Sequence, residues 1–131
     1  YQNILKYKHY SFNIIAEDFF EKAHQTSARY GIGINEFKEV GLTAMYKEKI
    51  RCPFVAESPL HIALELHEDI EIKSNKTRLI VGKVISISSL DSLAENKFEL
   101  DFQKLKSISI SGLSDYYTLN KLKSLNYAKP K

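Results

Sequence analysis

The chain has 131 residues, of which 44% are hydrophobic and 27% are charged, as in one ordinary globular domain. Its single cysteine, Cys52, excludes an internal disulfide and a zinc site built from several cysteines. The net charge of +3 argues against a dedicated nucleic-acid binder, and the longest apolar runs are too short to predict a membrane span.

The N-terminal part of the sequence predicts short helices around one strand. Apolar residues spaced i, i+3 and i+4 predict the end of a helix over residues 1–8. The β-branched and aromatic run 9–15 predicts a mostly buried strand, and two acidic residues at the start of 17–25 indicate the first turn of a helix. Residues 26–35, with two glycines, are predicted to form a loop that allows close backbone approach.

The middle of the sequence carries the strongest strand patterns. A short helix is predicted over residues 36–40, ended by Gly41. In residues 60–72 leucine and isoleucine alternate with mainly polar residues, which predicts a half-buried strand. With the polar turn that follows and the strand at 77–87, this segment predicts an antiparallel hairpin, and Gly82 indicates a bulge within it.

Few residues form a convincing chemical site without further information. His61, Glu65 and His67 would share one exposed strand face, but residues six apart on a strand lie about 20 Å apart, so one metal ion cannot bind both histidines. Cys52 is interpreted as a buried structural thiol. The many tyrosines and phenylalanines either line a planar ligand or, more simply, form ordinary core contacts.

Several segments, in order along nearly the whole chain, resemble motifs of the flavin reductase-like family. They are residues 12–18 (FNIIAED), 26–28 (TSA) with 36–43 (EFKEVGLT), 55–65 (VAESPLHIALE), 79–84 (LIVGKV), and 111–117 (SGLSDYY) with 125–130 (LNYAKP). The resemblance implies a β-rich α+β domain with the fold called the FMN-binding split barrel. The family's N-terminal third has no counterpart here, so the expectation is one domain over 1–131 that is N-terminally incomplete and lacks the first barrel strands.

The same resemblance implies a function and a set of site residues. Members of the family are homodimers that bind FMN noncovalently near the subunit interface and oxidise NADH or NADPH. The expected flavin-binding residues are Asn3, Asn13, Ser27, Ala28, Tyr30, Tyr116 and Tyr117. For Asn13 a structural role remains open, in which its amide satisfies backbone groups at the strand edge. No catalytic residue is assigned.

One departure from the family pattern bears on activity. Many members have a histidine shortly after the strand that corresponds to 79–84, and this chain has Ser88 there. Because serine offers no imidazole, one alternative to an oxidoreductase is a non-catalytic flavin carrier. The missing N-terminal third suggests another, a flavin-free interaction module of the same fold. The single unpaired cysteine leads us to expect a cytoplasmic protein.

Overall fold

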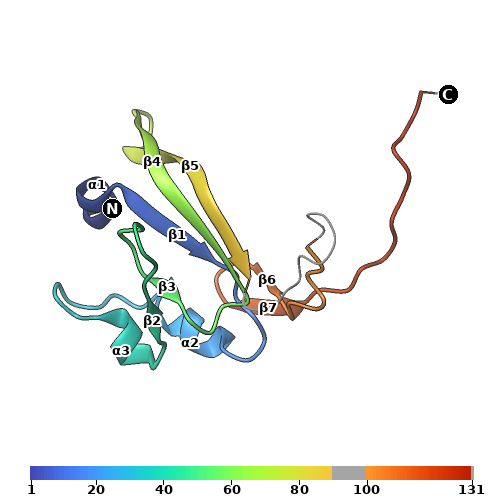
Figure 1. Ribbon diagram of the computed structural model, residues 1–131, viewed down its shortest axis with the longest axis horizontal. Helices are drawn as coiled ribbons and strands as arrows, with labels where there is room; N and C mark the ends of the chain where they lie inside the picture. The colour runs from blue at the N-terminus through green and yellow to red at the C-terminus, as the bar shows by residue number, and fades with distance from the viewer. Residues whose placement is uncertain (90–99, 131) are drawn as a thin grey trace.

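The computed structural model describes residues 1–89 and 100–130 of the chain. Figure 1 shows a body of short helices and antiparallel strands, from which the C-terminal segment extends away. The helices are α1 (Gln2–Tyr7), α2 (Phe20–Gln25) and α3 (Glu36–Val40). The strands are β1 (His9–Asn13), β2 (Ala44–Met45), β3 (Phe54–Val55), β4 (Leu60–Ile72), β5 (Thr77–Ser89), β6 (Ile108–Ser111) and β7 (Asp115–Thr118).

The strands form three separate sheets, ordered β1–β4–β5, β2–β3 and β6–β7. The α+β class is therefore as predicted. Within the described residues, however, these sheets do not close into a barrel, because β1 and β5 are edge strands of the largest sheet. The expected split barrel is present only in an open form, with two sheet edges left for pairing.

The β4–β5 hairpin was predicted and extends two residues further than expected, to Ser89. Its turn is held by Asn75, whose side-chain oxygen accepts hydrogen bonds from the backbone N–H and the hydroxyl of Thr77. The predicted bulge is also present, since the register shifts between Leu66 and Glu68, opposite Gly82. The Tyr10 side chain packs directly on Gly82, which leaves room for the tyrosine ring at the bulge because glycine has no side chain.

The predicted burial pattern of β4 is wrong over its first half. Alternation would expose His61 and Ala63, yet each is only 1% exposed. Leu60 and Leu64 on the opposite face are buried as well, because the N-terminal half of β4 is covered on both faces. His67 and Glu65 are exposed as predicted, and no metal-binding cluster occurs among residues 1–89 and 100–130.

Helix α2 begins at Phe20, three residues later than the sequence indicated. The reason is a long-range contact: Ala16 forms an isolated bridge with Ser107, and the Glu17 N–H donates to the Lys106 carbonyl at 3.0 Å. The bridge holds Ala16 in a sheet-like pairing, and residues 17–19 form a turn, in which the Phe19 N–H donates to the Ala16 carbonyl at 3.3 Å, before the helix begins. The small core beside α2 contains Ala16, Phe19, Val40 and Leu42, with Ala23, Tyr30, Phe37 and Val55 packed around it.

One face of the largest sheet is left partly uncovered. Phe12, Ile62 and Ile87 are cross-strand neighbours on β1, β4 and β5, so they share this face. Phe12 is 56% and Ile87 is 60% exposed, although both are large apolar side chains. The sheet therefore exposes apolar side chains on this face.

Two further expectations concern membrane-spanning helices and the single cysteine. No helix among the described ranges is both long enough and apolar enough to cross a bilayer. Cys52 is a free, buried thiol, as interpreted from the sequence, and burial raises its pKa, an effect that a hydrogen bond from Ser11 partly opposes.

Candidate functional site

A cavity of ≈ 310 Å³ lies where the end of β1 meets the β6–β7 hairpin. Its volume is at the lower end of the range for small-molecule sites. The lining is mainly apolar, with a few polar groups: Asn13, Ile14, Ile15, Phe102, Ser107, Ile108, Ser109, Ile110, Tyr116 and Leu119. Segments from opposite ends of the sequence form this cavity, because the Ala16–Ser107 bridge brings them together.

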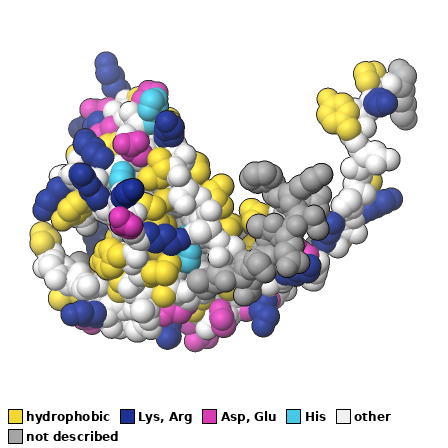
Figure 2. All heavy atoms as spheres, in the orientation of Figure 1, with side chains coloured by type: hydrophobic (Ala, Val, Ile, Leu, Met, Phe, Trp, Pro, Cys, Tyr) yellow, Lys and Arg dark blue, Asp and Glu magenta, His cyan; other side chains and the backbone are white. Residues whose placement is uncertain are grey.

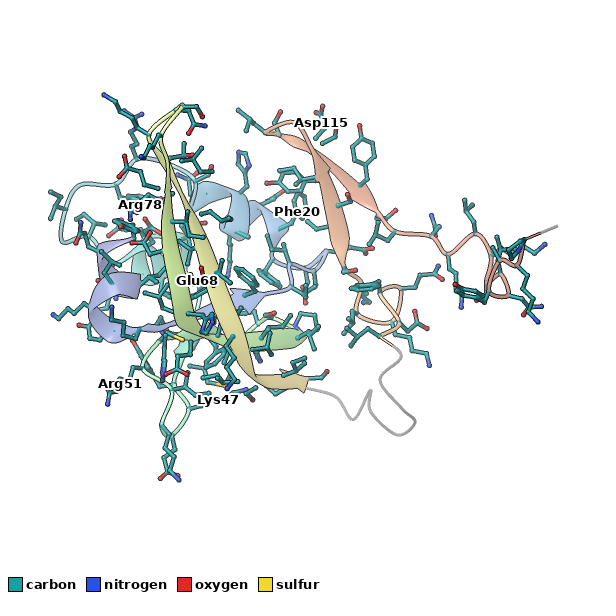
Figure 3. The ribbon with its side chains drawn as sticks, turned by 90° about the horizontal axis from the view of Figure 1, so that it is seen from above. Phe20, Lys47, Arg51, Glu68, Arg78 and Asp115 are labelled. Carbon is teal, nitrogen blue, oxygen red and sulfur yellow. The ribbon has the colours of Figure 1, made fainter. Side chains whose placement is uncertain are left out.

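Tyr116 connects the cavity to helix α2. Its hydroxyl lies 2.8 Å from His24 Nδ1, and its ring packs on Phe20 with centroids 5.2 Å apart. Figure 3 shows Phe20 on α2 directed toward the β6–β7 hairpin. The His24 bond restricts the orientation of the Tyr116 side chain, which is one of the residues that line the cavity.

Asn13 lines the same cavity, but its amide is engaged elsewhere. Its side-chain oxygen accepts a hydrogen bond of 3.0 Å from the Val55 N–H, and its amide nitrogen donates to Ser11 Oγ at 3.0 Å. Ser11 in turn donates to the Pro53 carbonyl at 2.7 Å. This chain of bonds ties β1 to β3 and matches the structural interpretation of Asn13.

Ser27, Ala28 and Tyr30 follow the C-terminus of α2. The amides of Ser27 and Ala28 donate to the carbonyls of His24 and Gln25, at 2.9 and 3.2 Å. Both amides are therefore occupied by the turn, which leaves the exposed Ser27 hydroxyl and the Ala28 methyl for any ligand contact. The Tyr30 ring packs against the core beside α2, and its hydroxyl accepts a hydrogen bond of 3.2 Å from Gln25.

The other two expected site residues do not line this cavity. Asn3 is exposed on α1, which precedes β1, whereas the cavity lies at the far end of that strand, about 16 Å away for five residues. Tyr117 alternates with Tyr116 on β7 and is 55% exposed. The structure thus brings Asn13 and Tyr116 together at one cavity, with Ser27, Ala28 and Tyr30 linked to it only through α2.

The sequence patterns predicted only Asn13 and Tyr116 among the residues that line the cavity; they missed Phe102 and the rest of the lining, and also Phe20 and His24, which contact Tyr116 from α2. Phe20 and His24 contact Tyr116 only because β7, more than ninety residues away, packs on α2. Phe102 lies in a segment with weak periodicity. The only usable signal was the i, i+4 spacing of Phe20 and His24, which places both on one face of a helix.

Ser88 lies on the other face of the β1–β4–β5 sheet, in a polar cluster beneath β2 and β3. Its hydroxyl accepts a hydrogen bond from Lys47, whose ammonium also lies 4.7 Å from the centre of the Phe54 ring. Directly across the strands is His61, whose Nε2 lies 2.7 Å from the Val55 carbonyl. An imidazole is therefore adjacent to position 88, but it is buried and bonded to backbone.

The cavity and the polar cluster around Ser88 differ in charge. Burial lowers the pKa of His61; the bond to Val55 opposes this effect, and the nearby Lys47 charge adds to it. Neutral imidazole is the favoured form there. The cavity lining contains neither lysine nor arginine, so its described residues suit a neutral planar group better than a phosphate.

The sequence profile of the flavin reductase like domain matches residues 1–108, most of the chain. The chain belongs to the flavin reductase-like family. A structural relative is the split-barrel protein of Shewanella frigidimarina NCIMB 400, provisionally described as a flavin reductase, with 35% identity and a TM-score of 0.92. The match covers 97% of this chain and 64% of that one.

Two more distant similarities were found, one to a solved structure and one to a protein sequence. Flavoredoxin of Desulfovibrio vulgaris (Miyazaki F) superimposes with a TM-score of 0.82 at 20% identity, over 97% of this chain and 67% of its own. An uncharacterised protein of Aquifex aeolicus (strain VF5) is 23% identical over 116 residues, 88% of this chain and 58% of its own length. This chain thus spans slightly less than two thirds of the first structural and curated relatives it matches.

Proposed function

We propose that this chain binds FMN noncovalently as part of a flavoprotein oxidoreductase. The observation that carries the proposal is a largely apolar cavity with a fixed tyrosine hydroxyl, in a chain of the flavin reductase-like family. The family includes an NADH:FAD oxidoreductase of Streptomyces globisporus C-1027, which supports a redox role with a nicotinamide donor, NADH or NADPH.

The cavity residues fit one part of the cofactor better than the other. Ile15, Phe102 and Ile110 offer apolar walls for a flavin ring, and the Tyr116 hydroxyl, held by His24, offers a hydrogen bond to its edge. Because no cation lines the cavity, we expect the phosphate to be held by residues beyond this set. When bound, FMN supplies an acceptor for a hydride or for single electrons, which the protein side chains do not provide.

The chain's own residues would bind and orient the ring. His24 fixes the Tyr116 hydroxyl, and Phe20 packs against the ring of Tyr116. The bonds of Asn13 to Ser11 and Val55 hold the end of β1 in place, so the wall that follows at Ile14 and Ile15 is rigid. Such preorganisation lowers the entropic cost of binding.

A flavin-binding titration tests this proposal. FMN fluorescence should be quenched on addition of the full chain, and the Ile110→Asp variant should weaken binding by about tenfold or more, because a carboxylate would face an apolar ring. The matched control is Leu113→Asp, on the same hairpin but 89% exposed and outside the cavity. No quenching at millimolar FMN, or equal loss in both variants, would refute the proposal.

A non-catalytic flavin carrier is the second candidate. The observation that favours it is Ser88, which is bonded to Lys47 and lies where many relatives have a histidine. Stopped-flow mixing of the FMN complex with NADH and with NADPH separates the two. Rapid bleaching of the flavin absorbance supports the oxidoreductase, whereas a complex that stays oxidised supports the carrier. A chain that folds and never binds flavin would be the third alternative, an interaction module.

We propose further that the chain forms a homodimer in the cytoplasm. The partly uncovered apolar face of Phe12 and Ile87 and the free edge of β5 support self-association, because such surfaces are rarely left in water. The free thiol of Cys52 is compatible with a reducing compartment. Sedimentation equilibrium at micromolar concentration tests the dimer, and fractionation of the source cells tests the location.

A further inference from the structure

Residues 119–130 leave the body of the protein as an extended arm. Figure 1 shows this segment running away from the end of β7 to the far side of the molecule, opposite the N-terminus. Twelve extended residues reach about 40 Å, whereas a folded chain of this size has a radius of gyration of about 14 Å. The arm is therefore long enough to cross the surface of a second molecule.

The base of the arm is attached and the rest is not. Leu119 lines the cavity, and the side-chain oxygen of Asn120 accepts a hydrogen bond of 3.4 Å from Gln103. From Lys121 onward, no hydrogen bond joins the arm to any other part of the chain that the structure describes. The arm is thus attached to the body at Leu119 and Asn120 and makes no hydrogen bond to the rest of the described chain beyond them.

Large apolar side chains occupy this free length. Leu122 is 99% exposed, Leu125 is 79% and Tyr127 is 91%. Figure 2 shows hydrophobic side chains on the projecting segment, well away from the body. An isolated exposed leucine needs no explanation, but three large apolar residues within six positions of an extended arm indicate a binding segment.

The comparison with the Shewanella frigidimarina structure bears on whether the arm is free. That match covers 97% of this chain, so only about four of 131 residues lie outside it and most of the arm lies inside. Chain ends that contact nothing are poorly ordered in crystals. If the arm takes the same path there, it is held by contacts that the described residues of one copy of this chain do not supply, either from the part of the relative's chain that the match does not cover or from a second copy.

Charge and position favour a second copy of the chain as that partner. The arm carries only basic charges, at Lys121, Lys123 and Lys129, whereas residues 17–21 of the body carry three carboxylates and no base. Glu17, Asp18 and Glu21 are all exposed. A second copy therefore supplies complementary charge, and steering between opposite charges promotes the encounter.

We infer that residues 121–130 are an exchanged arm, which docks through Leu122, Leu125 and Tyr127 on a second copy of this chain. This inference rests on the homodimer proposed above and does not depend on flavin. It gives the dimer a specific structural basis, because the arm of each copy docks on the other copy. Reciprocal exchange of this kind produces a closed dimer with two-fold symmetry.

A matched pair of variants of the full chain tests the arm. In Leu122→Asp/Leu125→Asp the dimer dissociation constant should rise at least about 100-fold, because two buried leucines are lost from each of two arms. Asn120→Asp/Asn126→Asp adds the same charge to the same arm without removing an apolar group, and it should change the constant less than about tenfold. Sedimentation equilibrium gives all three constants.

Isotope-filtered NMR on a mixture of ¹³C-labelled and unlabelled chains shows whether the contact is between copies. Cross-chain contacts from the Leu122 and Leu125 methyl groups are the expected result. A monomeric wild type, equal constants for the two double variants, or arm contacts found only within one chain would each overturn the inference. Because FMN titration is a separate measurement, failure to bind flavin would not be mistaken for failure of the arm to dock.

Discussion

Replacing Gly82 with alanine is expected to destabilise the fold through a clash with Tyr10. An ideal Cβ at position 82 would overlap the Tyr10 hydroxyl outright and lie 2.7 Å from Cζ of the same ring and 3.0 Å from a methyl group of Leu64. Ordinary contact begins at 3.4 Å, so Cζ must retreat by about 0.7 Å. That movement disturbs the edge-to-face contact of Tyr10 with Phe12, whose ring centres lie 5.7 Å apart.

The expected cost is about 1–3 kcal/mol of unfolding free energy, the usual range for an overpacked site in which a side chain can still shift. Urea denaturation followed by circular dichroism measures it. In a Tyr10→Ala background the same substitution should cost less than about 0.5 kcal/mol, because the clashing ring is gone. This double-mutant cycle isolates the contact from any effect of alanine on the strand itself.

Gly31→Ala is the matched control, because a Cβ there meets no atom within 4 Å and Gly31 is absent from the positive-φ glycines. It should be neutral or stabilise the protein by up to about 1 kcal/mol through the unfolded state. If Gly82→Ala is as neutral as Gly31→Ala, or costs the same with and without Tyr10, the bulge does not hold the tyrosine as we describe.

Three other predictions follow from buried groups. Burial lowers the pKa of His61, so the stability that the neutral imidazole contributes is present above the unfolded pKa of 6.5 and is lost as the pH falls below that value. In urea titrations, His61→Asn should flatten this pH dependence of the unfolding free energy, whereas the control His67→Asn, at an exposed position, should not. Asn13→Ala should cost about 1–3 kcal/mol, because it leaves the Val55 N–H without its acceptor, and unchanged stability would contradict that bond. The Cys52 thiol, buried and with a raised pKa, should react with a disulfide reagent at least about tenfold more slowly in the native than in the urea-unfolded protein.

Local patterns were sufficient wherever a single segment decides its own structure. The alternation over 60–72, the polar turn after it and the apolar run from 77 predicted the β4–β5 hairpin, and Gly41 in a left-handed conformation ends α3 as expected. Local patterns were insufficient for α2. Its acidic start at Glu17 is a good helix signal, but the backbone there bonds to Lys106 instead. A propensity of a few tenths of a kcal/mol does not outweigh a long-range backbone contact.

The candidate site was predicted unevenly for the same reason. Tyr116 and Asn13 were expected from the resemblance, and both line the cavity. The partners that give them a defined geometry, His24 for Tyr116 and Val55 for Asn13, are 92 and 42 residues away in sequence. Spacing along the chain carries no information about contacts at such separations. Ser27, Ala28 and Tyr30 were expected to contact the ligand, which stays a prediction; the backbone amides of all three are used within the turn.

By itself, the sequence determined the family, the α+β class and the positions of the long strands, because these depend on motif order and on patterns that repeat every two residues. Only the tertiary structure decided which face of each strand is covered. It buried His61 beneath β3, left Phe12 and Ile87 open, joined α2 to β7 through His24 and Tyr116, and sent the arm away from the body. The physical reason is that burial depends on what packs against a segment, and those partners come from distant parts of the chain.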